Sequence, residues 1–146
     1  MALTGEDRAS LLFEIDRFYA RQQAQLDTGD IDGFGRSFVA DASFGLGSGV
    51  QVPGGRAGIV GAMSGLVDRF RAARVQRHHW FGMRRVDTLD DGAIESVYYA
   101  IVSHTTADGT VTFEPSSVVT DHLVRTDDGE LAVRSRLILL DAKPAQ

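Results

Sequence analysis

The chain contains no cysteine, few prolines and more acidic than basic side chains, which together give a formal net charge of -5. The absence of cysteine excludes disulfide bonds, thiolate metal ligands and a thiolate nucleophile. The negative charge argues against a nucleic-acid partner, because such proteins present a basic surface. Six arginines lie between Arg69 and Arg85, and we interpret them as a solvated helix end and strand face.

Long apolar runs are also missing. No segment approaches the roughly 20 apolar residues of a membrane span, so we expect no membrane partner. The first ten residues, MALTGEDRAS, hold no basic stretch followed by apolar residues, so we expect no signal peptide and a cytoplasmic location. A length of 146 residues predicts one domain, residues 1–146, with a single core.

Helical spacing of apolar residues dominates the first half of the chain. It predicts a helix over about residues 6–27, a short second helix capped by Asp30, and a third helix over Gly58–Ala73. A short strand is expected around Ala42–Leu46. The glycine-rich stretch from Gly45 to Gly55 lacks a phosphate-loop pattern, so we interpret it as a flexible loop and a candidate lid.

Three Asp-Gly pairs, beginning at Asp91, Asp108 and Asp128, punctuate the second half. Asp-Gly between apolar runs is a strong hairpin signal, because glycine accepts the positive φ of tight turns. Four consecutive antiparallel strands are therefore predicted, at about 75–88, 94–106, 110–125 and 131–140. Helices followed by long strands predict an α+β fold, a curled antiparallel sheet with three helices packed in its concave face.

Two histidines 25 residues apart, His79 and His104, are the main candidates for chemistry. Strand alternation gives both of them largely apolar neighbours on the same face, as it does for Asp121 on a later strand. Imidazole exchanges protons near neutral pH, and a carboxylate can fix its tautomer. Asp27, at the end of the first helix, can serve His79 in this way or can be a simple turn residue. No local ligand spacing is present, so no metal is predicted.

The chain resembles the SnoaL-like branch of the NTF2-like superfamily, whose fold is an α+β cone, over about residues 8–141. The resemblance is carried by residues 19–44, by Gly55-Arg56, by the RHHWFG segment at 77–82, by the strand at 98–104 and by residues 120–136. Among these proteins the site is most similar to that of scytalone dehydratases. Their two catalytic histidines fall on His79 and His104, their aspartate on Asp27, and an active-site asparagine near Asp121. An aspartate–histidine dyad at Asp27 and His79 is similar to that of hexachlorocyclohexane dehydrochlorinases.

The resemblance implies a cofactor-independent cyclase or dehydratase acting on a hydrophobic, polyketide-like molecule. Its catalytic groups would be Asp27, His79, His104 and Asp121. Two tyrosines that hold a water in scytalone dehydratases correspond here to Leu26 and Phe44, so the cavity is expected to be more apolar. The expected substrate-binding residues are Tyr19, Phe34, Phe38, Phe44, Phe81, Met83, Tyr98 and Phe113.

Two other functions stay open at this point. One is a non-catalytic binding or interaction module, in which the polar groups satisfy one another. The other is a small subunit that resembles the β-subunit of ring-hydroxylating dioxygenases.

A homodimer is also expected, through the convex back of the sheet, with Trp80 in the interface. The back-facing residues predicted for it are His78, Trp80, Val97, Tyr99, Ile101, Val124 and Ile138.

Overall fold

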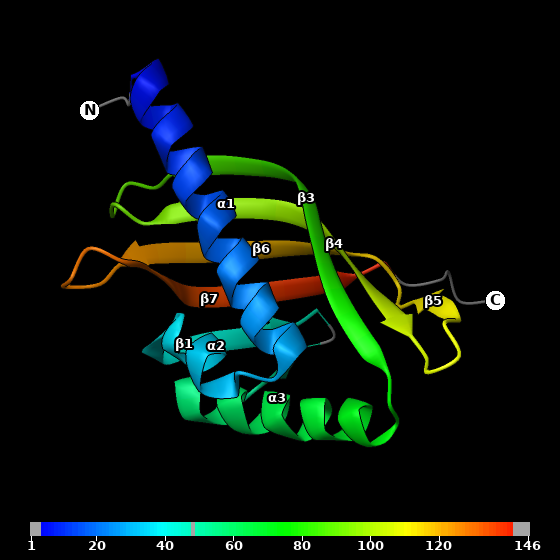
Figure 1. Ribbon diagram of the computed structural model, residues 1–146. Helices are drawn as coiled ribbons and strands as arrows, with labels where there is room; N and C mark the ends of the chain where they lie inside the picture. Colours follow the sequence, from blue (N-terminus) through cyan, green and yellow to red (C-terminus); the bar gives the residue numbers. More distant parts are fainter. Residues whose placement is uncertain (1–3, 48, 142–146) are drawn as a thin grey trace.

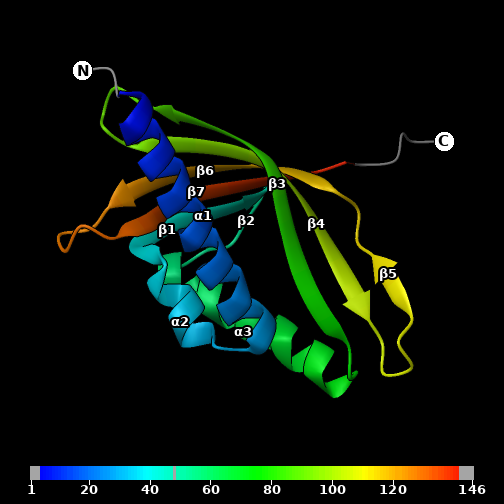
Figure 2. The same cartoon turned by 45° about the horizontal axis from the view of Figure 1, so that its top comes forward.

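Three helices and a seven-stranded sheet make up the computed structural model, which describes residues 4–47 and 49–141. The helices are α1 (Gly5–Thr28), α2 (Ile31–Arg36) and α3 (Gly55–Ala72). The strands are β1 (Phe38–Leu46), β2 (Val50–Gln51), β3 (Gln76–Thr88), β4 (Ile94–Thr105), β5 (Val111–Phe113), β6 (Ser117–Arg125) and β7 (Leu131–Leu140). The helices cover one face of the curled sheet, and α1 runs across the strands (Figures 1 and 2). The α+β fold with helices in the concave face is therefore confirmed.

Local sequence signals fix both ends of α1. Thr4 and Asp7 form a reciprocal capping box at its start, which satisfies amide groups that the helix leaves free. At its end Gly29 adopts φ 86°, and its amide donates to the carbonyl of Leu26 at 3.2 Å. This left-handed residue ends the helix just after Asp27 and directs the chain into α2.

The sheet is mixed rather than wholly antiparallel. Its strand order is β2-β1-β7-β6-β4-β3, with β5 paired to the end of β4. β1 runs parallel to β7, while the other neighbours are antiparallel. The parallel pair forms because β7, the last strand of the chain, lies beside β1. No local turn motif predicts this long-range pairing. Part of the glycine-rich stretch forms a hairpin between β1 and β2, in which Leu46 pairs with Val50. The helix α3 begins at Gly55, the last residue of this stretch and three residues earlier than predicted.

The predicted strand at 110–125 is two strands, β5 and β6, which both pair with β4. Glu114, Pro115 and Ser116 separate them. Phe113 pairs with Ser103, which faces the convex side of the sheet, and Phe113 is 62% exposed. Its predicted place in the cavity lining is therefore wrong.

A β-bulge also interrupts β3. The register shifts between Gly82 and Arg85, and Met83 takes φ 52°. Because the bulge reverses the alternation of faces, Met83 points outward and is 80% exposed, contrary to its predicted place in the lining. A second register shift, between His122 and Leu123 in the pairing of β6 with β7, reverses which side chains of β7 point toward the core. Ile138 therefore packs against the core and not on the convex back.

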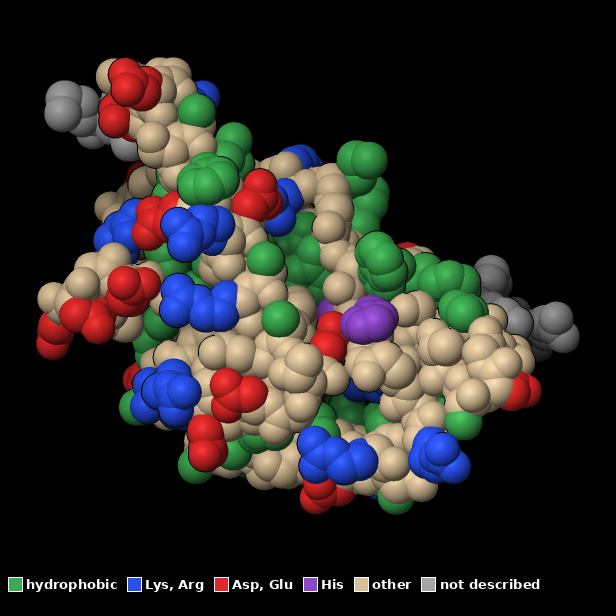
Figure 3. All heavy atoms as spheres, in the orientation of Figure 1, with side chains coloured by type: hydrophobic (Ala, Val, Ile, Leu, Met, Phe, Trp, Pro, Cys, Tyr) green, Lys and Arg blue, Asp and Glu red, His purple; other side chains and the backbone are tan. Residues whose placement is uncertain are grey.

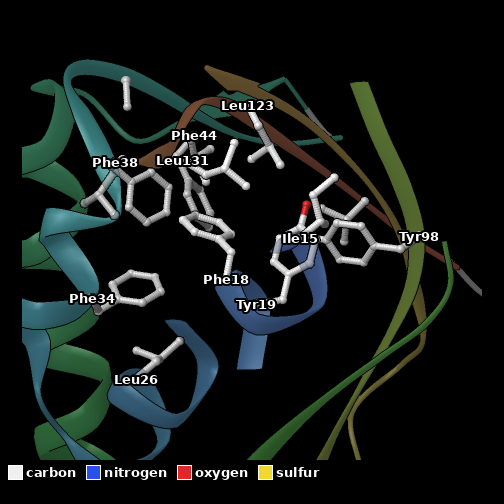
Figure 4. Packing of buried hydrophobic residues seen from close by; sticks show 14 of the residues in the cluster. Ile15, Phe18, Tyr19, Leu26, Phe34, Phe38, Phe44, Tyr98, Leu123 and Leu131 are labelled. Carbon is white, nitrogen blue, oxygen red and sulfur yellow. The ribbon is translucent and has the colours of Figure 1, made fainter. Parts of the chain in front are cut away.

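Most of the predicted aromatic lining is hydrophobic core. Phe34, Phe38 and Phe44 are almost completely buried and pack against each other, with ring centroids 5.2 and 6.3 Å apart. Figure 4 shows Phe34 and Phe38 on one side of Phe18, with Tyr19 and Tyr98 on the other. No helix among the described residues is long and apolar enough to cross a membrane.

Candidate functional site

Asp27 and His79 form a direct pair between the last turn of α1 and the edge strand β3. Asp27 Oδ1 lies 2.6 Å from Nδ1 of His79, and Asp27 Oδ2 accepts the backbone N–H of His79 at 3.1 Å. The side chains are only 9% and 14% exposed. One carboxylate oxygen thus engages the imidazole and favours a proton on Nδ1, while the other fixes the backbone of the same residue. Within residues 4–47 and 49–141 no protein group hydrogen-bonds to Nε2 of His79, which leaves this nitrogen for a ligand.

The pair forms part of the walls of two pockets. The first, of about 380 Å³, lies where the end of α1, the end of α3 and the start of β3 meet. Its apolar wall consists of Leu26, Val67, Phe70 and Val75, and its polar wall includes Gln76 and Arg77. In Figure 3 the surface is hollowed in this region, with histidine and acidic side chains beside it.

The second pocket, of about 490 Å³, follows the groove between α1 and β3. Tyr19 and Phe81, two of the expected substrate-binding residues, line it. Arg84 lies at its far end in an ion pair with Asp16, and burial lowers the pKa of this arginine. The Asp27–His79 pair therefore borders both spaces on the concave side.

His104 belongs to a second carboxylate–imidazole pair, with a partner that the sequence analysis missed. Its Nε2 lies 2.7 Å from Oε2 of Glu114, and the same oxygen accepts from Nη2 of Arg77 at 2.6 Å. Burial raises the pKa of Glu114, but hydrogen bonds from His104 and Arg77 outweigh it, so that the pKa lies below its ordinary value. The ring of Phe70, which lines the first pocket, meets His104 edge-on at 4.9 Å.

The structure does not bring Asp121 to the histidines. Asp121 is fully buried, and its two oxygens accept four hydrogen bonds, from Tyr19 at 2.8 Å, from Tyr98 at 3.0 Å, and from Nε and Nη2 of Arg136 at 2.8 Å each. Arg136 also donates to Gln22 at 2.8 Å. Because its four donors come from α1, β4 and β7, this carboxylate holds α1 to the sheet.

Charge in this cluster shifts the pKa values of its members. Burial and then the charge of Asp121 raise the pKa of Tyr19 well above its ordinary value. Burial likewise raises the pKa of Tyr98, although the charge of Arg136 opposes the shift. Burial alone would lower the pKa of Arg136, but the Asp121 carboxylate raises it. The core therefore contains a fixed ion pair between Asp121 and Arg136, to which the neutral hydroxyl groups of Tyr19 and Tyr98 donate hydrogen bonds.

Two charged partners of the expected site residues, Arg136 and Glu114, were not predicted from the sequence. Arg136 lies on the inward face of β7, opposite Asp121 in the register, but the register shift on this strand reverses the alternation, so a count from the buried Leu131 and Val133 would place Arg136 outward, as it placed Ile138. Glu114 lies between two strands and is brought to His104 by the β5 pairing, which nothing local predicts.

No cluster of three or more His, Asp or Glu side chains suited to a metal ion occurs in the part of the chain that the structure describes.

Comparison with known proteins gives a family model and several solved structures. The model, described as a SnoaL-like domain, matches residues 7–136. No curated protein matches the sequence. The structure is similar to that of Aln2 from a Streptomyces species, with 38% identity, a TM-score of 0.84, and coverage of 97% of this chain and 95% of that one.

Two further structures extend the comparison. A Catenulispora acidiphila structure in complex with S-DNPA is 34% identical, with a TM-score of 0.80 and coverage of 91% of this chain and 95% of that one. An NTF2-like protein with a cystatin-like fold, from Novosphingobium aromaticivorans, is 22% identical, with a TM-score of 0.76 and coverage of 94% of this chain and 88% of that one. The last likeness is one of fold alone.

Proposed function

This chain belongs to the SnoaL-like family, and from that premise we propose that it is a cofactor-independent acid/base enzyme. Its reaction would be a cyclisation or a dehydration of a hydrophobic, polyketide-like small molecule. The observation that carries the proposal is the Asp27–His79 pair, 2.6 Å apart and largely shielded from solvent, in the wall of an apolar pocket.

His79 is the proposed general base. With its Nδ1 held by Asp27, its Nε2 takes a proton from a carbon next to a carbonyl or from a hydroxyl group. The Asp27 carboxylate then stabilises the imidazolium that forms. We assign the second proton-transfer role to His104 and not to Asp121, whose oxygens already accept four hydrogen bonds.

The substrate class is inferred from the pocket and from one relative. Leu26, Val67, Phe70 and Val75 offer apolar contact, while His79 and Arg77 supply the polar groups that orient a ligand. The Catenulispora relative is crystallised with the small molecule S-DNPA. A bound apolar molecule would also displace water from the pair and so strengthen its electrostatic effect.

We propose, in addition, that two copies associate through the convex face of the sheet. Trp80, Tyr99, Leu137 and Leu139 lie on this face and are each 40% exposed or more. Such a contiguous apolar face is unusual on a monomer.

The catalytic proposal is tested with S-DNPA and with a separate panel of hydroxylated aromatic polyketides as probes. Each is incubated with the protein in D₂O, and mass spectrometry follows gain or loss of water and uptake of deuterium. We expect conversion by the native protein, and a rate about 10²- to 10⁴-fold lower for His79→Ala, which is what general acid/base catalysis typically contributes.

The matched control is His122→Ala, which removes an imidazole from the opposite face of the sheet, where it pairs with Glu95. This variant should keep the native rate, and circular dichroism should show both variants folded. An unchanged rate for His79→Ala would contradict the proposal. Binding of the probes without any conversion by the native protein would instead favour a binding module.

A further inference from the structure

We propose that Glu114 is a positioning residue that fixes the orientation of His104 and presents its Nδ1, rather than its Nε2, to the substrate. The inference rests on the proposed acid/base function. Its basis is the single carboxylate oxygen, Oε2, that lies 2.7 Å from Nε2 of His104 and 2.6 Å from Nη2 of Arg77.

Glu114 is held in place by its backbone as well as by its side chain. Its amide donates to the carbonyl of Val102 at 2.9 Å, two residues before His104 on β4. β5 pairs with the same end of β4, and Thr112 lies directly opposite His104. Glu114 therefore follows directly after a paired strand, and its own backbone hydrogen bond anchors it beside the imidazole.

Arg77 keeps the carboxylate in a defined direction. Its Nε and Nη2 both donate to Oε2 of Glu114, at 3.2 and 2.6 Å. Its guanidinium also lies over the ring of Phe70, 4.6 Å from the centroid. Because Phe70 contacts the His104 ring edge-on, the imidazole is fixed by an apolar ring on one side and a carboxylate on another.

The register brings the two histidines close together on the concave face. His104 pairs with Arg77, and His79 pairs with Val102, so the histidines are diagonal neighbours on adjacent antiparallel strands. Diagonal neighbours of this kind lie about 7–8 Å apart. His79 lines the first pocket, and the His104 ring lies directly behind Phe70, another residue of that lining.

The two rings are held by opposite nitrogens. Asp27 engages Nδ1 of His79, whereas Glu114 engages Nε2 of His104. A carboxylate on one nitrogen favours a proton there and leaves the other nitrogen for the substrate. Among residues 4–47 and 49–141, no protein group hydrogen-bonds to Nδ1 of His104. His79 thus works through Nε2 and His104 through Nδ1, which accepts from or donates to a substrate oxygen.

The first measurement needs no substrate. Long-range ¹H–¹⁵N NMR of histidine-labelled protein identifies which ring nitrogen carries the proton and whether that proton is in a strong hydrogen bond. We expect a downfield proton on Nε2 of His104 in the native protein, and its loss in Glu114→Ala. Retention of the native signal in Glu114→Ala would overturn the inference, whatever the activity.

The second measurement is turnover of whichever probe the native protein converts. Loss of a charge-assisted hydrogen bond predicts a kcat about 10- to 100-fold lower for Glu114→Ala, with KM nearly unchanged. Glu114→Gln, which keeps an acceptor oxygen at the same place, should recover part of this loss. An unchanged kcat in a folded Glu114→Ala protein would overturn the positioning role while leaving the proposed function intact.

A matched pair on the other face provides the control. Glu95 lies 3.0 Å from His122, and Glu95→Ala removes a carboxylate from an imidazole without touching either pocket. It should leave both the His104 signal and kcat unchanged. Full turnover in His79→Ala would refute the proposed function itself and remove the basis of this inference, an outcome distinct from normal kcat in Glu114→Ala.

Discussion

At the scale of the residue, the two carboxylate–imidazole pairs differ in how far the sequence could predict them. Asp27 was open to two interpretations, as a turn residue or as a partner of His79. It satisfies both, since its main chain precedes the helix end while its side chain reaches β3. Glu114 was not predictable, because its contact with His104 depends on the β5 pairing. Strand alternation in the sequence predicts which face of a strand a histidine occupies. It does not predict which carboxylate, far away in the sequence, will contact that histidine.

The two buried tyrosines, Tyr19 and Tyr98, predict how the stability of the protein depends on pH. The pKa values of Tyr19 and Tyr98 are raised in the folded protein, so the folded state keeps these two protons when the unfolded state loses them. Their contribution to stability is therefore complete below about pH 10, the ordinary value, and is lost as pH rises through the folded pKa values. We expect the free energy of unfolding to fall above pH 10, by roughly 1.4 kcal/mol per pH unit for each buried tyrosine.

Tyr99 supplies the internal control, because it is 57% exposed on the convex face. Phenolate absorbance should show that Tyr19 and Tyr98 stay protonated in the native protein above pH 10 and ionise after unfolding. The steep alkaline loss of stability should be weaker in Tyr98→Phe and unchanged in Tyr99→Phe. Ionisation of Tyr19 and Tyr98 near pH 10 in the folded protein would show that the Asp121 cluster is not buried as described.

At the scale of the element, local signals placed the helices and hairpins well, and long-range pairing accounts for the errors. The Asp-Gly turns at Asp91, Asp108 and Asp128 each contain a glycine with positive φ, as predicted. The parallel pairing of β1 with β7 and the bulge at Met83 depend on contacts across the fold. One inserted residue reverses every face beyond it, which is why Met83 and Ile138 were assigned to the wrong sides.

The end of α1 gives an element-scale prediction, because it positions Asp27. Gly29 has φ 86°, a conformation that costs an L-residue about 1–2 kcal/mol. Gly29→Ala should lower the free energy of unfolding by about that amount and reduce turnover by displacing Asp27. Gly61, in the middle of α3, has ordinary helical geometry and open space around it. Gly61→Ala should therefore stabilise the protein by roughly 0.5–1 kcal/mol. Urea unfolding measures both, and a stabilising Gly29→Ala would show that this cap is not left-handed.

At the scale of the whole molecule, helices cover the concave face of the sheet and leave the convex face without a partner in the single chain. The strand register places the apolar side chains of the convex face in rows that run across the strands. Tyr99, Val118 and Leu139 form one row, and Trp80 pairs with Ile101 in the next. A hydrogen bond from Trp80 Nε1 to Ser103, at 3.0 Å, fixes the indole before any association. A preordered, self-complementary apolar face is what a two-fold dimer requires.

Association through this face predicts a particle of about twice the chain mass of 15.8 kDa at micromolar concentration, measured by light scattering. Trp80→Glu should dissociate it, because the new carboxylate would lie unpaired and desolvated within the interface. The control is Phe13→Glu, which places the same charge at another exposed aromatic residue, 64% exposed on α1. It should leave the dimer intact. A native protein that scatters as a monomer, or a Trp80→Glu variant that stays dimeric, would exclude the convex face as the interface.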